Sequence, residues 1–223
     1  MSQTSGLSMP LVGLLSLLVG LFYQGGSAVW DDHVLITGHL AQLEVKDLLS
    51  LWTQPVGSRG PGQGYYRPVA LTVMAVTSWG GIWLIHITCA LIHAASSCMI
   101  VRLLQGQRGA LLAGLCFGLH PLGSEVLGWA SALPDALSVC LALAAVLCLE
   151  RSPRWAMLLA VAAVASKETG VLVLGALVLG LQPTRRGWAL VGLGAAFVLC
   201  SRLGLGIETQ FNLDGREHMY AAA

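Results

Sequence analysis

Residues 120–135 read H-P-L-G-S-E-V-L-G-W-A-S-A-L-P-D and lie between two long apolar runs. This stretch contains His120, Glu125 and Asp135, and it has no lysine or arginine. Ionisable residues beside a membrane are costly to keep, so a functional site is their default explanation. A solvated hairpin between two helices is the alternative interpretation of the same residues.

The composition is typical of an integral membrane protein. Of the 223 residues, 56% are hydrophobic and 10% are charged, and the mean hydropathy is +0.74. Soluble domains carry about 25% charged residues. We therefore expect a single membrane module over residues 1–208, followed by a short polar tail at 209–223. The formal net charge of +1 argues against a nucleic-acid partner.

Apolar runs along the chain predict an all-α integral membrane fold with about seven transmembrane helices. The first run lacks basic residues before it, which favours an uncleaved helix over a signal peptide. Residues 69–79, before Gly80-Gly81, predict a dipping or buried extension. Several runs are shorter than the ~17 residues of a full span, which predicts a recess on one side. The predicted spans are 7–23, 82–103, 109–119, 135–149, 155–166, 170–181 and 187–203.

Residues 30–68 form the longest polar segment and predict an amphipathic first loop. Leucines at 40, 43, 48 and 51 recur at roughly helical spacing beside charged residues, which predicts a short helix lying in the membrane interface. Residues 58–64, S-R-G-P-G-Q-G, predict an irregular loop. All six cysteines fall inside apolar runs, so we interpret them as packing residues and not as disulfides or a zinc site.

The basic residues indicate the orientation of the chain. Three short loops carry paired arginines, whereas the alternate short loops carry no cation or only Lys167. By the positive-inside rule the arginine loops are cytoplasmic, which places ten of the eleven acids on the extracytoplasmic side. The arginine pairs are Arg102 and Arg108, Arg151 and Arg154, and Arg185 and Arg186.

Four polar motifs follow one another at predicted loop edges on that extracytoplasmic side. They are W-D-D-H at 30–33, Y-Y-R-P at 65–68, H-P-L-G-S-E-V-L-G-W-A-S at 120–131 with Pro134-Asp135, and S-K-E-T at 166–169. Together they resemble polytopic glycosyltransferases of the C superfold, in particular tetratricopeptide-containing transmembrane O-mannosyltransferases and their bacterial relatives. The resemblance covers about residues 10–200.

The resemblance implies a seven-helix core with an amphipathic first extracytoplasmic loop and a polyprenyl-phosphate sugar as donor. It also implies a multi-pass protein of the bacterial inner membrane. In that family an acid of the first loop is the catalytic base, and Asp32 or Asp31 occupies the matching place. Arg67 and Lys167 match positions that can hold the donor phosphate. The remaining motif positions, expected to line the substrate pocket, are His120, Glu125, Asp135 and Glu168.

Two departures from the family pattern bear on activity. Relatives place a basic residue just before the acid that matches Asp135, where this chain has Leu133-Pro134. Relatives also continue with further helices, so we expect a protein partner alongside the membrane lipids. If the chain is a transferase, the Asp32 carboxylate should face a recess formed by residues 120–135 and 166–169.

Each candidate residue also has a plainer interpretation. Asp31 and Asp32 can cap the following helix, and Arg67 can extend its side chain to the lipid headgroups. Glu168 at a helix start favours the helix dipole, and His120 before a proline can end a helix. The carboxylates can instead hold a divalent cation such as Mg²⁺ or Mn²⁺. Because no metal-specific spacing is present, the sequence does not decide whether a metal ion binds.

Three other functional classes compete with the transferase interpretation. The first is a non-catalytic membrane subunit that retains this fold. The second is a haem protein, because His86 and His93 are seven residues apart on one predicted helix face, although bis-histidine ligation needs histidines on opposite sides of the haem. The third is a transporter, for which an internal repeat would be expected.

Overall fold

The computed structural model describes residues 5–22, 27–30, 32–55, 65–181 and 183–205, with side chains in the first helix from Met9 onward. Within these residues the chain forms helices and connecting loops, without a β-strand. The fold is therefore all-helical, as predicted. The predicted tail at 209–223 and the irregular loop at 58–64 lie outside the described residues.

The long helices occupy the predicted apolar runs. They are α1 (Ser5–Phe22), α3 (Pro68–Ser78), α4 (Ile82–Leu103), α5 (Ala110–Leu119), α7 (Leu133–Cys148), α8 (Pro153–Ser166), α9 (Gly170–Leu181) and α10 (Arg185–Leu205). Three of them begin with a proline in the first turn, where the missing amide proton costs nothing. Gly81 joins α3 to α4 with a φ of 83°, a backbone conformation that glycine adopts at little cost.

Three apolar helical stretches in the described part of the chain are long enough to cross a membrane. They are α4, the 19-residue stretch Ala130–Cys148 that contains α7, and α10. The stretch Met9–Phe22 of α1, and the helices α3, α5, α8 and α9, have 10–17 residues, and at 1.5 Å per residue they fall short of a hydrocarbon core about 30 Å thick. The number of seven spans therefore stays a prediction.

The first loop differs from the single amphipathic helix that its leucine spacing predicts. It consists of short helical turns, η1 (His33–Thr37), η2 (Leu40–Gln42), η3 (Val45–Leu49) and α2 (Ser50–Thr53). The break falls at Leu43 and Glu44, whose backbones are extended. The Glu44 side chain accepts a hydrogen bond at the start of η3, while Asp47 accepts one from the Glu44 amide at 3.0 Å. This capping box starts a new helix at Glu44, within the stretch that the leucine spacing predicts as one continuous helix.

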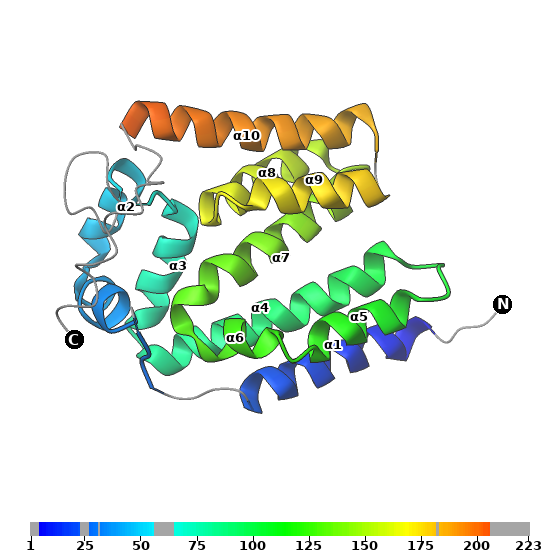
Figure 1. Ribbon diagram of the computed structural model, residues 1–223, viewed down its shortest axis with the longest axis horizontal. Coiled ribbons are helices and arrows are strands. Elements are labelled where there is room, and N and C mark those ends of the chain that lie inside the picture. The colour runs from blue at the N-terminus through cyan, green and yellow to red at the C-terminus, as the bar shows by residue number, and fades with distance from the viewer. Residues whose placement is uncertain (1–4, 23–26, 31, 56–64, 182, 206–223) are drawn as a thin grey trace, which may run out of the picture.

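Two groups of buried residues hold the helices together. The first joins the short helices of the first loop to α3, α4 and the start of α7, and includes Leu40, Leu51 and Met74. The second joins α7, α8, α9 and α10, and includes Leu174 and Leu190. Figure 1 shows α1, α4 and α5 on one side of α7, with α8, α9 and α10 on the other. Helix α3, predicted as a buried extension, packs against α4, α7 and α8.

A glycine at the start of α9 brings the loop after α8 close to α7. A β-carbon at Gly170 would lie 2.6 Å from the Ser138 hydroxyl oxygen and 2.9 Å from the carbonyl oxygen of Ala163. Any side chain at this position would push α9 away from α7, because close helix approach needs small residues. Gly170 therefore fixes the position of the neighbouring polar residues Lys167 and Glu168.

Candidate functional site

Lys167 and Asp135 form an ion pair between two helix ends. Asp135 lies in the first turn of α7, while Lys167 directly follows α8. The Lys167 Nζ lies 2.5 Å and 2.6 Å from the two carboxylate oxygens of Asp135. The two side chains are 22% and 42% exposed, so the pair is half shielded from water. Lys167 is thus the cation that pairs with the Asp135 carboxylate.

Arg67 and Glu168 form a second and more precisely oriented pair. Arg67 donates from Nε to Oε2 at 3.1 Å and from Nη2 to Oε1 at 2.9 Å. Two parallel hydrogen bonds of this kind are stronger than a point contact and fix the planes of both groups. The guanidinium also lies 4.9 Å from the centre of the Tyr65 ring, within cation–π range. Arg67 is therefore held by protein groups, contrary to the interpretation that it extends freely to the headgroups.

The electrostatics of Glu168 follow from this pairing. Burial raises the pKa of the carboxyl, but the hydrogen bonds and the charge of Arg67, with a smaller contribution from Lys167, outweigh the burial and lower the pKa overall. Glu168 is therefore a charged carboxylate at neutral pH. It joins its own loop to the loop that carries Arg67.

Asp32 is fully buried and bonded to the 120–135 stretch. Its Oδ1 accepts hydrogen bonds from the amide of Ser131 at 2.8 Å and from the hydroxyl of Ser131 at 2.5 Å. Its Oδ2 accepts a third from the amide of Val29 at 3.1 Å. The Asp32 side chain makes no capping hydrogen bond to the following helix η1. Asp32 thus connects the first loop to the residues just before α7.

A pair of tryptophans lies beside this contact. The rings of Trp30 and Trp129 meet edge to face, with their centres 5.6 Å apart and an interplanar angle of 77°. Trp30 has a φ of 49°, a strained conformation for a residue with a β-carbon. The same two segments are therefore joined by an aromatic contact and by the buried Asp32–Ser131 hydrogen bonds.

The other predicted site residues are placed less centrally. His120 and Glu125 are exposed. The Nδ1 of His120 accepts a hydrogen bond from the amide of Leu122 at 3.2 Å, and His120 directly follows the last residue of α5. These contacts fit the interpretation of His120 as a helix-ending residue. Asp31 lies outside the described residues.

The four polar motifs are joined by three contacts. Residues 30–33 reach 120–131 through Asp32 and Ser131, the end of 120–135 reaches 166–169 through Asp135 and Lys167, and 65–68 reaches 166–169 through Arg67 and Glu168. We call these three motif-linking contacts, made by Asp32–Ser131, Asp135–Lys167 and Arg67–Glu168, the polar end of the molecule. It holds two cations that can bind phosphate oxygens and a buried carboxylate that can accept a proton through Ser131.

Ser131 is the functional candidate that the sequence analysis did not select. It lies inside the quoted G-W-A-S motif, but serine is common in loops and nothing in its spacing points to Asp32, 99 residues earlier. A half-buried hydroxyl bonded to a buried carboxylate is recognisable once the fold is known. Tyr65, the first residue of the Y-Y-R-P motif, also has a specific contact with Arg67.

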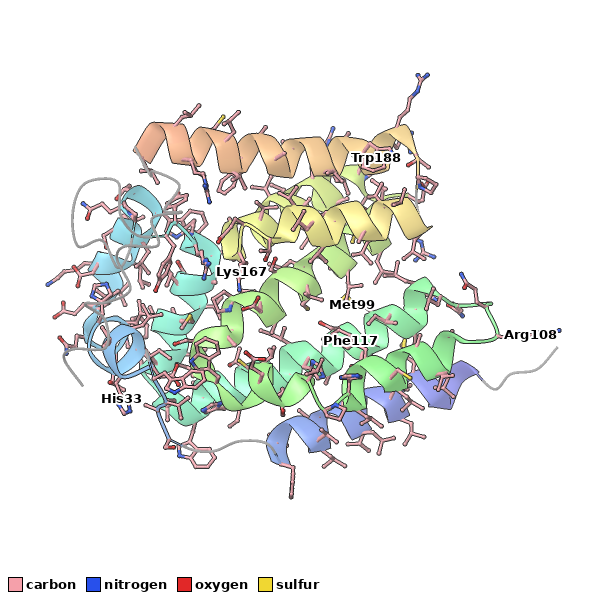
Figure 2. The ribbon with its side chains drawn as sticks, in the orientation of Figure 1. His33, Met99, Arg108, Phe117, Lys167 and Trp188 are labelled. Atoms are coloured by element: carbon pink, nitrogen blue, oxygen red, sulfur yellow. The ribbon has the colours of Figure 1, made fainter. Side chains whose placement is uncertain are left out.

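The two histidines of α4 contact backbone carbonyl groups. The Nδ1 of His86 lies 3.1 Å from the carbonyl oxygen of Leu127, while the Nε2 of His93 lies 3.3 Å from that of Gly118. His93 also stacks on the Phe117 ring. These contacts are typical of membrane histidines that bind neighbouring helices. In Figure 2, Phe117 lies apart from His33 and Lys167.

Metal-binding residues do not cluster in the part of the chain that the structure describes. Among those residues, no three of the histidine, cysteine, aspartate and glutamate side chains come together in a way that could hold a metal ion. In comparisons with known proteins, no family, no curated protein and no solved structure matches this chain.

Proposed function

We propose that this chain is a membrane glycosyltransferase-like protein that uses a polyprenyl-phosphate sugar donor at its polar end. In this proposal the chain crosses a bacterial inner membrane about seven times, and the polar end faces the extracytoplasmic side. The observation that carries it is the convergence of Arg67 and Lys167 on neighbouring carboxylates, although they come from loops about a hundred residues apart.

The two cations have the chemistry that a lipid phosphate requires. The planar fork of Arg67 matches two phosphate oxygens, and Lys167 adds a compact positive charge. In the structure Glu168 and Asp135 are the ion-pair partners of Arg67 and Lys167. A donor phosphate binds by taking the place of one or both carboxylates, so the two cations stay paired while each displaced carboxylate loses its ion-pair partner.

Asp32 acts through Ser131 in this proposal, because its own carboxylate is buried. The acceptor hydroxyl passes its proton to the Ser131 hydroxyl, which passes its own proton to Asp32. The acceptor oxygen then bonds to the anomeric carbon of the sugar. The bond from that carbon to the phosphate breaks, and the lipid phosphate leaves with its charge balanced by Arg67 and Lys167. General-base assistance of this kind contributes roughly 10²–10⁴ in rate.

A non-catalytic subunit of a larger membrane complex is the second candidate. It is favoured by a specific observation, namely that three hydrogen bonds already satisfy Asp32 and that both cations are neutralised within the protein. In that role the same contacts only hold the loops together.

Binding of polyprenyl phosphate separates the two candidates. The purified protein is titrated with polyprenyl phosphate and, as a reference, with the uncharged polyprenol of equal length, and thermal unfolding is followed. We expect polyprenyl phosphate alone to raise the unfolding temperature, and Arg67→Gln to abolish the rise. Lys46→Gln is the matched control, because Lys46 is an exposed cation of the first loop that pairs with Glu44. An equal response to both lipids would reject phosphate binding at this site.

A further inference from the structure

The end of the molecule opposite the polar end carries six arginines. Helices α7 and α8 have 16 and 14 residues, so at 1.5 Å per residue their far ends lie more than about 20 Å from the polar end. Figure 2 shows Arg108 and Trp188 at this far end, away from Lys167 and His33. The loops here contain Glu150 as their single acid. We call this region the arginine end, formed by Arg102, Arg108, Arg151, Arg154, Arg185 and Arg186.

These arginines are exposed and available to an outside partner. The three ion pairs found among the described residues involve Lys46, Arg67 and Lys167, and all lie in the first loop or at the polar end. Arg102 donates a hydrogen bond to the side chain of Gln105, a neutral group. The positive charge at the arginine end is thus compensated by far fewer carboxylates than the charge at the polar end.

Two exposed tryptophans accompany the arginines. Trp155 is 64% exposed and follows Arg154 in the first turn of α8, and Trp188 is 47% exposed and follows Arg186 in the first turn of α10. Helices α8 and α10 pack against each other, so the two arginine–tryptophan groups lie on adjacent helix starts. Indole rings with one apolar and one polar edge concentrate at the membrane–water boundary.

Helix α10 indicates which partner this surface meets. It is long and apolar enough to cross a membrane, and only 11% of its most apolar window is buried inside the protein. Its outward leucines, including Leu193, Leu199 and Leu203, are exposed along its length. A helix with such a face lies against lipid, which puts Arg185 and Arg186 at the level of the headgroups. Arginine binds phosphate oxygens through two parallel hydrogen bonds, which a lysine cannot make.

We propose that the arginine end is a binding surface for anionic phospholipid headgroups. The lipid phosphates are held by Arg151 and Arg154, near the start of α8, and by Arg185 and Arg186, at the start of α10. Trp155 and Trp188 lie beside the glycerol backbones. This surface is separate from the donor site at the polar end and does not depend on it. An acidic peptide or a nucleic acid would meet the charges but not the apolar length of α10 directly below them.

Lipid selectivity in bilayers of known composition tests this surface. The full chain is reconstituted in bilayers that contain spin-labelled phosphatidylglycerol or spin-labelled phosphatidylcholine, and the motionally restricted fraction of each is measured by electron paramagnetic resonance. We expect phosphatidylglycerol to be preferred. Each arginine that reaches the headgroups contributes up to a factor on the order of five, and the preference should fall steeply as added salt screens the exposed charges.

Variants locate the selectivity on the molecule. Arg186→Gln should reduce the preference for phosphatidylglycerol. The double variant Arg151→Gln and Arg185→Gln removes two arginines and should reduce the preference more than Arg186→Gln alone. Arg186→Lys keeps the charge but loses the fork, and should retain an intermediate preference. Lys46→Gln removes an exposed cation outside the arginine end and should leave the preference unchanged. Equal restriction of both lipids by the unmodified protein, or an equal effect of Lys46→Gln and Arg186→Gln, would overturn the proposal.

Discussion

Asp32 and Ser131 are 99 residues apart in the sequence, yet the Oδ1 of Asp32 accepts hydrogen bonds from both the amide and the hydroxyl of Ser131. Asp32 is fully buried at this contact. Loss of any one of the three donors to this buried carboxylate should destabilise the protein, because an unsatisfied charge in a protein interior is costly. The contact therefore fixes the first loop against the residues that begin α7.

The Asp32–Ser131 contact should appear as a coupling energy in a double-mutant cycle. Asp32→Asn keeps one acceptor but places an amide group against the donors, and Ser131→Ala removes the hydroxyl donor. We expect each single change to destabilise the protein by about 1–3 kcal/mol. The double variant should lose less than the sum, by about 0.5–3 kcal/mol, in denaturant unfolding in micelles. Strictly additive losses would show that the two side chains do not interact.

The Arg67–Glu168 pair should make stability depend on acid pH. The pKa of Glu168 in the folded protein is lowered below its ordinary value near 4.5. The pair therefore contributes its full stability above that ordinary value, and loses it as the pH falls through the lowered pKa. Unfolding temperatures measured between pH 7 and acid pH should fall for the unmodified protein. Glu168→Gln should be less stable at neutral pH and should show a flatter acid dependence; an unchanged slope would remove Glu168 as its source.

The Lys167–Asp135 pair should be worth less than its short distance suggests, because its carboxylate is 42% exposed to water. Half-exposed pairs contribute about 1 kcal/mol or less. We expect Lys167→Met and Asp135→Asn each to lower the unfolding free energy modestly. The double variant should recover part of that loss, since it leaves neither charge alone. A double variant that is less stable than either single one would contradict the pairing.

The polar end and the arginine end should be labelled from opposite sides of the membrane. Ser124 lies in α6 (Gly123–Gly128) next to the polar end, while Gln107 lies in the loop between α4 and α5. In a background without native cysteines, Ser124→Cys should react with an impermeant thiol reagent from outside, and Gln107→Cys only after the membrane is opened. Reaction of both from the same side would remove the proposed topology and the extracytoplasmic donor site with it.

Local patterns in the sequence predict most of the helices and few of the contacts. The apolar run 82–103 matches α4 at both ends, whereas α7 begins at Leu133, two residues before its predicted start, because Pro134 is favoured in the first turn. The leucine spacing at 40–51 fails as a single helix, because the capping box of Glu44 and Asp47 competes with it.

The partners of the charged residues could not be predicted from spacing. Arg67 and Glu168 are 101 residues apart, and Lys167 and Asp135 are 32 apart. These residues, far apart in the sequence, are brought together by the packing of α3, α7, α8 and α9. That packing depends on small residues such as Gly170. The motifs therefore contain the residues of the three contacts, but they do not separate them from His120 and Glu125, which are exposed. Only the tertiary structure shows that Asp32 is buried and that its carboxylate is hydrogen-bonded to Ser131.

Turnover of the donor lipid tests the central claim most directly. The protein is isolated together with whatever membrane partner co-purifies with it, and release of labelled sugar from polyprenyl-phosphate mannose is measured for the unmodified protein and for Asp32→Asn. Folding of the variant is checked by unfolding temperature, and donor binding by the shift that polyprenyl phosphate causes. The account predicts turnover by the unmodified complex and a loss of roughly 10²–10⁴ in Asp32→Asn with binding retained. Near-normal turnover in folded Asp32→Asn, or no turnover by the intact complex, would contradict it.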